Sequence, residues 1–164
     1  LRTESPVIVD IFPCDKSTHY NGDCTRTVVN GIAPEEIENA YNTVVKAKFA
    51  AMKATKSGVT GEEVHRETIR IILEHGYKTG LPGADSSNTR CAMVHGTGHG
   101  VGLEVHEPPL LDLKGPALVT GDVLTIEPGL YCPAWGGVRS EDMVAVRDQD
   151  CENFNKLPDT LTWK

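Results

Sequence analysis

The sequence predicts an α+β fold, in which a curved and largely antiparallel sheet carries helices on its convex side. Two observations carry this prediction: a β-rich hairpin lies near each end of the chain, and a pair of amphipathic helical segments lies between them. With 164 residues, 39% hydrophobic and 24% charged, the chain is long enough for one domain with its own core. We therefore treat residues 1–164 as one structural unit.

The first hairpin is predicted from two β-rich runs, Val7–Phe12 and Cys24–Val29, on either side of the polar stretch Asp15–Gly22. Asp10 and Asp23 are symmetric about the Lys16–Ser17 peptide bond. In a hairpin of regular register, residues symmetric about the turn lie directly opposite each other, with Cβ atoms about 4.5–5.5 Å apart. We therefore expect these two carboxylates to lie side by side.

Two helices follow. Pro34 and the acidic residues after it are typical of a first helical turn, which predicts a helix over Pro34–Lys56. Thr60 and Glu63 have the spacing of a capping box, which predicts a second helix ending before Gly76. The side chains expected to face the core are Ile37, Tyr41, Val44, Val45 and Met52 in the first helix and Val64, Ile69, Ile72 and Leu73 in the second.

The rest of the chain contains a glycine- and histidine-rich segment and a second hairpin. The segment "TRCAMVHGTGHGVGLEVHEPP" fits neither a helix nor a plain strand. After it, "DVLTIEPGLYC" and "GGVRSEDMVAV" flank the turn-like "PAWGG". Glu127 and Glu141 are symmetric about Ala134, so this hairpin should also place two carboxylates opposite each other. The order hairpin, helix pair, irregular segment, hairpin is that of one and a half copies of a repeated unit.

Paired carboxylates predict a metal site. Like charges directly opposite each other are destabilising, and a cation relieves the repulsion. Four carboxylates balance two divalent ions, and oxygen donors with one imidazole suit Mn²⁺, Co²⁺, Fe²⁺ or Zn²⁺. The best imidazole is His99, within the run Gly96–Gly102, where the absence of side chains lets the backbone approach the site. His95 and His106 flank it and could serve a substrate.

The segments "VDIFPCDKSTHYNGDCTRT", "HGTGHGVGLEVHEPP", "TIEPGLY" and "GGVRSED" resemble the successive metal-site motifs of the pita-bread metallopeptidases. The resemblance runs from Val7 to about Val146. It implies the pita-bread fold and a site for two divalent ions, with Mn²⁺ the expected activator. By motif position it implies that Asp23 and Glu141 bridge the ions. The five implied ligands are Asp10, Asp23, His99, Glu127 and Glu141.

Within this family the sequence is similar to the Xaa-Pro aminopeptidase and prolidase branch. Methionine aminopeptidases share the ligands and the His106 position but generally lack a His at the position of His95 and an Arg at that of Arg139. Tyr131, four residues after Glu127, also fits the proline-directed branch. The resemblance thus implies an exopeptidase that hydrolyses the bond between an N-terminal residue and a following proline. Methionine aminopeptidase is the alternative activity.

The resemblance also implies roles for the residues around the ions. Glu127 would move the proton of the attacking water to the leaving nitrogen, and His106 and His95 would polarise the scissile carbonyl. Tyr131 would support the substrate, and Arg139 would hold a ligating carboxylate bidentately.

The sequence departs from the family in two ways. The step from Asp10 to Asp23 is thirteen residues, two more than is usual, and the extra residues fall at the hairpin tip. The two helices and the substrate-contacting His that precede the first Asp in family members are absent, and His19 is a poor replacement. We therefore expect the C-terminal portion of a catalytic domain. Its first hairpin should expose an apolar patch, and a homodimer is one expected outcome.

The sequence opposes three other classes of protein. A non-catalytic pita-bread module that binds peptides is opposed by the complete ligand set, as is a creatinase-like hydrolase that works without metal. A mononuclear iron oxygenase with His95, His99 and Asp10 as ligands would leave Glu127 and Glu141 unexplained.

Charge and cysteine content bound the remaining possibilities. The net charge of −7 and the absence of a basic cluster predict that nucleic acid is not a partner. The sequence has no apolar run of about 18 residues, so no membrane span is predicted. The five cysteines are an odd number with no CxxC pair, so we expect neither a disulfide framework nor a zinc cluster. A cytoplasmic location follows from the expected free thiols.

Overall fold

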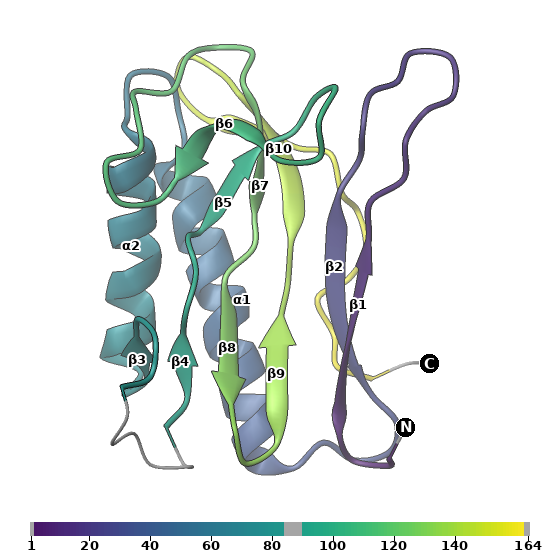
Figure 1. Ribbon diagram of the computed structural model, residues 1–164. Coiled ribbons are helices and arrows are strands. Elements are labelled where there is room, and N and C mark those ends of the chain that lie inside the picture. Colours follow the sequence, from purple (N-terminus) through teal and green to yellow (C-terminus); the bar gives the residue numbers. More distant parts are fainter. Residues whose placement is uncertain (1, 84–89, 163–164) are drawn as a thin grey trace.

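The computed structural model describes residues 2–83 and 90–162, and Thr89, the first residue of the predicted irregular segment, lies outside these ranges. The described residues form an α+β fold of two helices and three sheets, in which only one strand pair, β3 with β4, is parallel (Figure 1). The elements are β1 (Pro6–Ile11), β2 (Cys24–Val29), α1 (Glu35–Ala54), α2 (Gly61–Glu74), β3 (Lys78–Thr79), β4 (Ala92–Met93), β5 (Gly98–Gly100), β6 (Glu107–Leu111), β7 (Val123–Ile126), β8 (Gly129–Cys132), β9 (Gly136–Arg139), β10 (Asp142–Val146) and β11 (Cys151–Asn153).

The helices form where the caps and apolar spacing predict. Thr60 and Glu63 make the reciprocal hydrogen bonds of a capping box at the start of α2. The α1 residues Ile37, Tyr41 and Val44 are fully buried. One predicted core position is wrong, because the side chain of Leu73 is 50% exposed at the end of α2.

The first hairpin forms, but its predicted register is wrong. Asp10 pairs with Thr25 instead of Asp23. The turn is centred one position later than expected, because the Asp15 carboxylate accepts hydrogen bonds from the backbone and side chains of Ser17 and Thr18. A slip of two residues keeps every side chain on its face, so Asp10 and Asp23 are diagonal neighbours on the face that also carries Thr25.

The second hairpin has the predicted register but is shared between two sheets. Gly129 pairs with Arg139 in the β8–β9 ladder, and Ile126 pairs with Asp142 in the β7–β10 ladder. Between these ladders the same register brings Glu127 opposite Glu141. The segment predicted to fit neither a helix nor a plain strand contains the short strands β4 and β5 and the start of β6, and the pairing of β5 with β6 is irregular between His99 and Gly100.

The three sheets lie side by side. One sheet is the hairpin β1–β2, the second has the order β3-β4-β8-β9, and the third has the order β11-β10-β7-β5-β6. Helices α1 and α2 cover one face of the second and third sheets, and the hairpin lies next to β9 (Figure 1). The core between helices and strands includes Val44, Ile72, Leu124 and Leu130.

The first hairpin exposes apolar side chains, as expected. Val9, Ile11 and Phe12 are 37%, 57% and 58% exposed. The C-terminal segment 157–162 runs along β2, where Val29 donates a backbone hydrogen bond to the carbonyl of Leu161.

The expectation that the cysteines form no disulfide is wrong, because Cys91 and Cys132 are bonded to each other. Ala92 pairs with Tyr131 between β4 and β8, which places the two adjoining cysteines opposite each other. Their separation of 41 residues carries no local signal of this pairing. Among the described residues, neither helix combines the length and apolarity needed to cross a membrane.

Candidate metal centre

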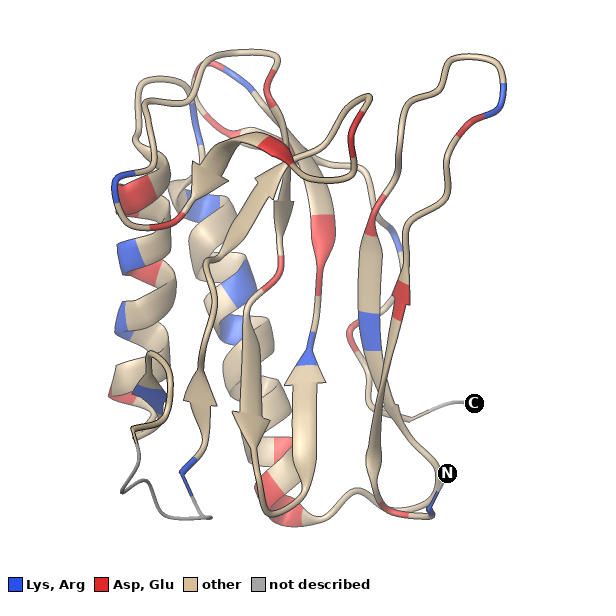
Figure 2. Ribbon diagram, viewed as in Figure 1, with Lys and Arg blue, Asp and Glu red and all other residues tan. Residues whose placement is uncertain are grey.

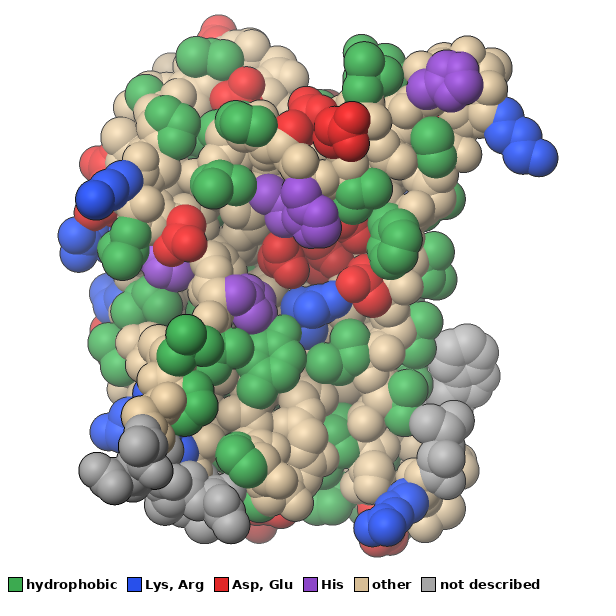
Figure 3. Space-filling view, viewed as in Figure 1, with side chains coloured by type: hydrophobic (Ala, Val, Ile, Leu, Met, Phe, Trp, Pro, Cys, Tyr) green, Lys and Arg blue, Asp and Glu red, His purple; other side chains and the backbone are tan. Residues whose placement is uncertain are grey.

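A cavity of about 380 Å³ lies where the hairpin β1–β2 meets the other two sheets. Figure 2 shows acidic positions on the hairpin and on the strands beside it, and Figure 3 shows acidic side chains gathered near the centre of this face, next to histidine and basic side chains. The cavity is lined by all five predicted ligands together with His106, Arg139, Phe12 and Val105.

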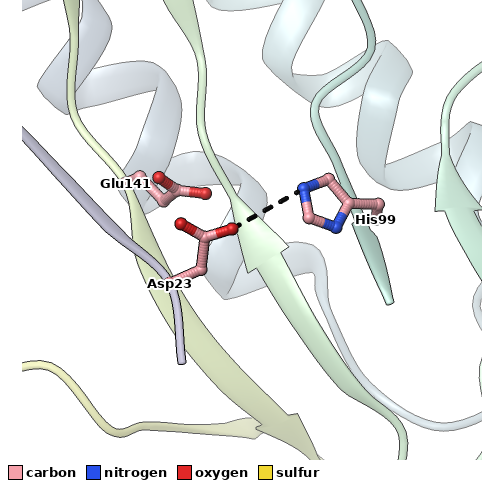
Figure 4. Close-up of side chains that lie close together, drawn as sticks. All are labelled: Asp23, His99 and Glu141. Carbon is pink, nitrogen blue, oxygen red and sulfur yellow. Dashed lines mark ion pairs between the residues drawn. The ribbon is translucent and has the colours of Figure 1, made fainter. Parts of the chain in front are cut away.

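Three of the predicted ligands form a compact buried group. Donor atoms of Asp23, His99 and Glu141 all lie within 4.8 Å of one another, and the three side chains point toward a common centre (Figure 4). They come from three parts of the chain: Asp23 directly precedes β2, His99 is in β5, and Glu141 lies between β9 and β10. A group of this size and composition can hold a divalent ion.

The backbone and ring of His99 are fixed by its neighbours. The missing side chain of Gly98 allows β5 to approach β7, because a Cβ there would lie 1.9 Å from the carbonyl oxygen of Thr125. The His99 Nδ1 lies 3.0 Å from the carbonyl oxygen of Gly100, and since a carbonyl only accepts, Nδ1 carries the proton. The Nε2 lone pair therefore faces the cavity, 3.4 Å from Glu127 Oε1 and 4.0 Å from Asp23 Oδ2.

Glu141 is held at both ends by Thr25. The Thr25 hydroxyl donates to Glu141 Oε2 at 2.6 Å, and the Thr25 carbonyl accepts from the Glu141 backbone N–H at 3.0 Å. Thr25 lies on the same face of the hairpin as Asp23 because it is two residues further along the extended chain.

Asp10 and Glu127 complete the carboxylate set through Arg139. The Arg139 guanidinium forms an ion pair with Asp10, and its Nε lies 3.8 Å from Glu127 Oε2. The predicted bidentate hold on one carboxylate is therefore wrong, and Arg139 contacts two different carboxylates instead. The reason is its position on β9, between the hairpin and the segment that carries Glu127.

Of the remaining predicted catalytic residues, one lines the cavity and two lie beside it. His106 is exposed and lines the cavity, with its ring centroid 4.1 Å from that of His99. His95 and Tyr131 lie deeper, where the Tyr131 hydroxyl and His95 Nε2 are 2.8 Å apart. Arg139 Nη1 donates to the same hydroxyl at 3.4 Å, which links this pair to the carboxylates.

Burial and crowding raise the pKa values of three carboxyls. Burial, with help from Asp10, raises the pKa of Asp23 to about 6, and burial raises that of Glu127 to about 7 although Arg139 opposes the shift. Burial, with repulsion from Glu127, raises the pKa of Glu141 to about 8. Burial also lowers the pKa of His99, which favours the neutral imidazole that ligates metals.

These properties fit divalent cations. Four carboxylates and one neutral imidazole share one cavity, and Arg139 supplies a single positive charge against them. A cation placed among them would favour the charged carboxylates, which burial and, to a smaller extent, mutual repulsion oppose.

Several residues around the site were not predicted. Thr25 could have been found, because its spacing of two from Asp23 places it on the same face. Phe12 and Val105, which line the cavity, and the ionic residues Arg26, Lys48, Asp142 and Asp159 behind Glu141 carried no signal of a role.

Comparisons with known proteins agree with this geometry. Residues 1–148 match metallopeptidase family M24. The chain is 38% identical over 139 residues to the Xaa-Pro dipeptidase of Pyrococcus furiosus, covering 84% of this chain and 36% of that protein. It is 40% identical over 145 residues to a putative Xaa-Pro aminopeptidase of Mycoplasma pneumoniae, covering 85% of this chain and 38% of that protein.

Solved structures give the same result. The prolidase of Pyrococcus furiosus superimposes with a TM-score of 0.84 at 35% identity, over 96% of this chain and 43% of that one. The X-Pro aminopeptidase of Thermotoga maritima gives a TM-score of 0.85 at 28% identity, over 99% and 43%. The chain thus spans less than half the length of these relatives, and the predicted pita-bread fold is confirmed. This chain belongs to metallopeptidase family M24.

Proposed function

We propose that this chain carries the active site of a dinuclear exopeptidase that hydrolyses the bond between an N-terminal residue and a following proline. The observation that supports the proposal most strongly is the single cavity lined by all five expected donors, Asp10, Asp23, His99, Glu127 and Glu141. Proline specificity rests on the names of the relatives and on His95, Tyr131 and Arg139, which form one hydrogen-bonded series beside the cavity.

The proposed cofactor is a pair of divalent ions, with Mn²⁺ the expected metal and Co²⁺, Zn²⁺ or Fe²⁺ as alternatives. Asp10, Asp23, His99, Glu127 and Glu141 would hold these ions. When bound, the ions would acidify a water and polarise the substrate carbonyl.

The protein's own groups would complete the reaction. Glu127 lies at the edge of the buried group with a raised pKa, which suits a carboxylate that accepts a proton and passes it to the leaving nitrogen. His106 is exposed at the cavity and could donate a hydrogen bond to the developing oxyanion. The carboxylate of Asp10 is held by Arg139, which in turn contacts the Tyr131 hydroxyl.

His95 would act less directly than the resemblance implies. Its Nδ1 lies 2.7 Å from the carbonyl oxygen of Gly96 and its Nε2 is bound by Tyr131, so both ring nitrogens are engaged. We therefore propose that His95 orients Tyr131 toward the substrate. The expected partner is a peptide with proline at its second position, whereas the homodimer and the cytoplasmic location stay predictions.

Selectivity tests the proposal. The Mn²⁺-loaded protein is expected to hydrolyse an Ala-Pro peptide at least about 10-fold faster, in kcat/KM, than a Met-Ala-Ser peptide. Release of the N-terminal amino acid measures both rates. Comparable turnover of the two peptides would instead assign the methionine aminopeptidase activity, and hydrolysis of neither by metal-loaded protein would favour a peptide-binding module.

His106→Ala is expected to lower kcat by about 100-fold while leaving Mn²⁺ stoichiometry unchanged, because the side chain is assigned to the oxyanion and not to an ion. His19→Ala, at the exposed tip of the first hairpin, is the matched control and should leave both quantities unaltered. Loss of Mn²⁺ from His106→Ala would contradict the assigned role.

A further inference from the structure

An ionic cluster with two buried and two partly buried members lies directly behind Glu141. It consists of two basic residues, Arg26 of β2 and Lys48 of α1, and two acidic residues, Asp142 of β10 and Asp159 of the C-terminal segment. Lys48 is fully buried and its Nζ lies 2.7 Å from Asp142 Oδ2 and 2.8 Å from Asp159 Oδ1. Arg26 Nη2 lies 2.6 Å from Asp142 Oδ1. The four charges balance.

Burial of such a cluster needs an explanation other than stability. Removing charged groups from water costs several kcal/mol per ion, and apolar replacements of buried ion pairs are often as stable or more stable. Helix α1, which carries Lys48, also contributes the buried side chains of Tyr41 and Val44 to the hydrophobic core. What the charged groups can supply and apolar groups cannot is a fixed position for the backbone they hold.

The cluster holds the backbone of Glu141 from both sides. Ser140, the preceding residue, donates its hydroxyl to Asp159 Oδ1 at 2.6 Å. Asp142, the following residue, is held by Lys48 and Arg26. The carbonyl oxygen of Glu141 itself accepts from Arg26 Nη1 at 2.6 Å.

Arg26 is the centre of this arrangement, because each of its five N–H groups has an acceptor. Nη1 donates to the carbonyls of Glu141 and Thr25, Nη2 to Asp142 and the carbonyl of Leu157, and Nε to the carbonyl of Pro158. Thr25 is also the residue whose hydroxyl binds the Glu141 carboxylate. One guanidinium therefore fixes both residues that determine where this carboxylate lies.

We propose that Arg26, Lys48, Asp142 and Asp159 are positioning residues that set the place of the Glu141 carboxylate and thereby the affinity of the site for divalent cations. The inference rests on the proposed metal centre but not on the identity of the peptide substrate. The residues that bind Arg26 and Lys48 from the C-terminal segment, 157–159, follow the region that matches the family, residues 1–148. This segment is thus part of the apparatus that holds the metal site.

Arg26→Lys is the principal test. Lysine keeps the positive charge beside Asp142 but cannot reach the four carbonyls and the carboxylate that the guanidinium binds. Titration calorimetry of chelator-treated protein with Mn²⁺ alone should show an affinity about 10- to 100-fold weaker than that of the wild type. Ser140→Ala, which keeps all four charges, is the second variant and should weaken Mn²⁺ binding by about 10-fold. If Arg26→Lys does not fold, the Mn²⁺ affinity of Ser140→Ala alone tests the inference.

Two controls separate positioning from stability. Ile72→Val reduces core packing on α2, which carries none of the four ionic residues, and should lower the melting temperature while leaving Mn²⁺ affinity unaltered. Arg70→Lys changes an exposed arginine paired with Glu67 and Glu74 on α2 and should alter neither property. Wild-type affinity in Ser140→Ala and in folded Arg26→Lys would overturn the inference, as would an equal loss in Ile72→Val.

The outcome is distinguishable from that of the proposed function. Weakened Mn²⁺ binding in Arg26→Lys and Ser140→Ala, with no hydrolysis of Xaa-Pro peptides by the wild type, would support the positioning role and contradict the peptidase activity. Unchanged Mn²⁺ binding in both variants, with hydrolysis of Xaa-Pro peptides by the wild type, would contradict the positioning role and support the peptidase activity. A wild type that binds no Mn²⁺ would contradict both.

Discussion

Asp23→Asn is expected to weaken Mn²⁺ binding by more than about 100-fold. Replacing a group that only supports a ligand typically costs 10- to 100-fold in metal affinity, so loss of a donor should cost more. Asp23 lies in the group whose donor atoms are within 4.8 Å of one another, and the amide keeps its shape while removing its charge. Calorimetric titration with Mn²⁺ and elemental analysis after loading measure the effect.

The same substitution should act in the opposite direction on the metal-free protein. Burial and Asp10 raise the pKa of Asp23 to about 6, so near neutral pH its charge destabilises the fold when no cation is present. Asp23→Asn should therefore raise the melting temperature in chelator and abolish the further rise that Mn²⁺ gives the wild type.

Asp15→Asn is the matched control, because Asp15 belongs to the same hairpin but its carboxylate accepts hydrogen bonds from Ser17 and Thr18 at the exposed tip. It should loosen the tip and leave Mn²⁺ affinity unchanged. Wild-type Mn²⁺ affinity in Asp23→Asn would remove Asp23 from the ligand set.

The helices and the second hairpin could be predicted because local chemistry determines them. The Thr60–Glu63 capping box starts α2 through contacts only three residues apart. The turn after β8 is short, so counting outward from Ala134 gives the observed register between Gly129 and Arg139. Neither feature depends on a partner far away in the sequence.

The register of the first hairpin could not be obtained by the same counting. Its long tip contains an Asp that accepts four hydrogen bonds from Ser17 and Thr18, and this turn shifts the centre of the hairpin by one position. Asp10 therefore lies opposite Thr25. The face was still correct, because a shift of two residues in pairing preserves the alternation of a strand.

The residues that support the site could not be predicted from the sequence, because their partners are far away along the chain. Lys48 reads as a solvated helix residue, yet it is fully buried against Asp142 and Asp159, which are 94 and 111 residues away. The Cys91–Cys132 bond likewise depends on the pairing of β4 with β8. Contacts of this kind follow from the tertiary fold, whereas the donor set could be recognised from its motifs.

The metal-free protein is expected to lose stability as the pH rises from about 6.5 to about 8. The pKa of Glu127 is about 7 and that of Glu141 about 8 in the fold, against an ordinary value of 4.5. The folded state therefore holds protons that the unfolded chain has already released in this range. Stability from these groups is complete below about pH 4 and is lost as the pH rises through the two folded values.

The lower limit of the window follows from the histidines. Burial lowers the pKa values of His65, His95 and His99. The stability that these groups contribute to the fold is therefore lost as the pH falls below their ordinary value of 6.5, which opposes the effect of the carboxyls in that range. Above 6.5 the carboxyls act alone among these groups. Since one proton contributes about 1.4 kcal/mol per pH unit, the expected loss is on the order of 2 kcal/mol.

Mn²⁺ should reverse this trend, because it competes with protons for the same oxygens and binds more tightly as they are released. At 100 times its dissociation constant, a bound ion adds about 2.7 kcal/mol to the free energy of unfolding. Urea unfolding at pH 6.5, 7.25 and 8, in chelator and in Mn²⁺, measures both slopes. Glu141→Gln should reduce the metal-free slope to the part that Glu127 contributes and should remove most of the Mn²⁺ effect, because the Glu141 carboxyl contributes to both. A metal-free slope that is flat or rising in the wild type would show that these carboxyls do not hold their protons in the fold, and the electrostatic case for a cation between them would fail.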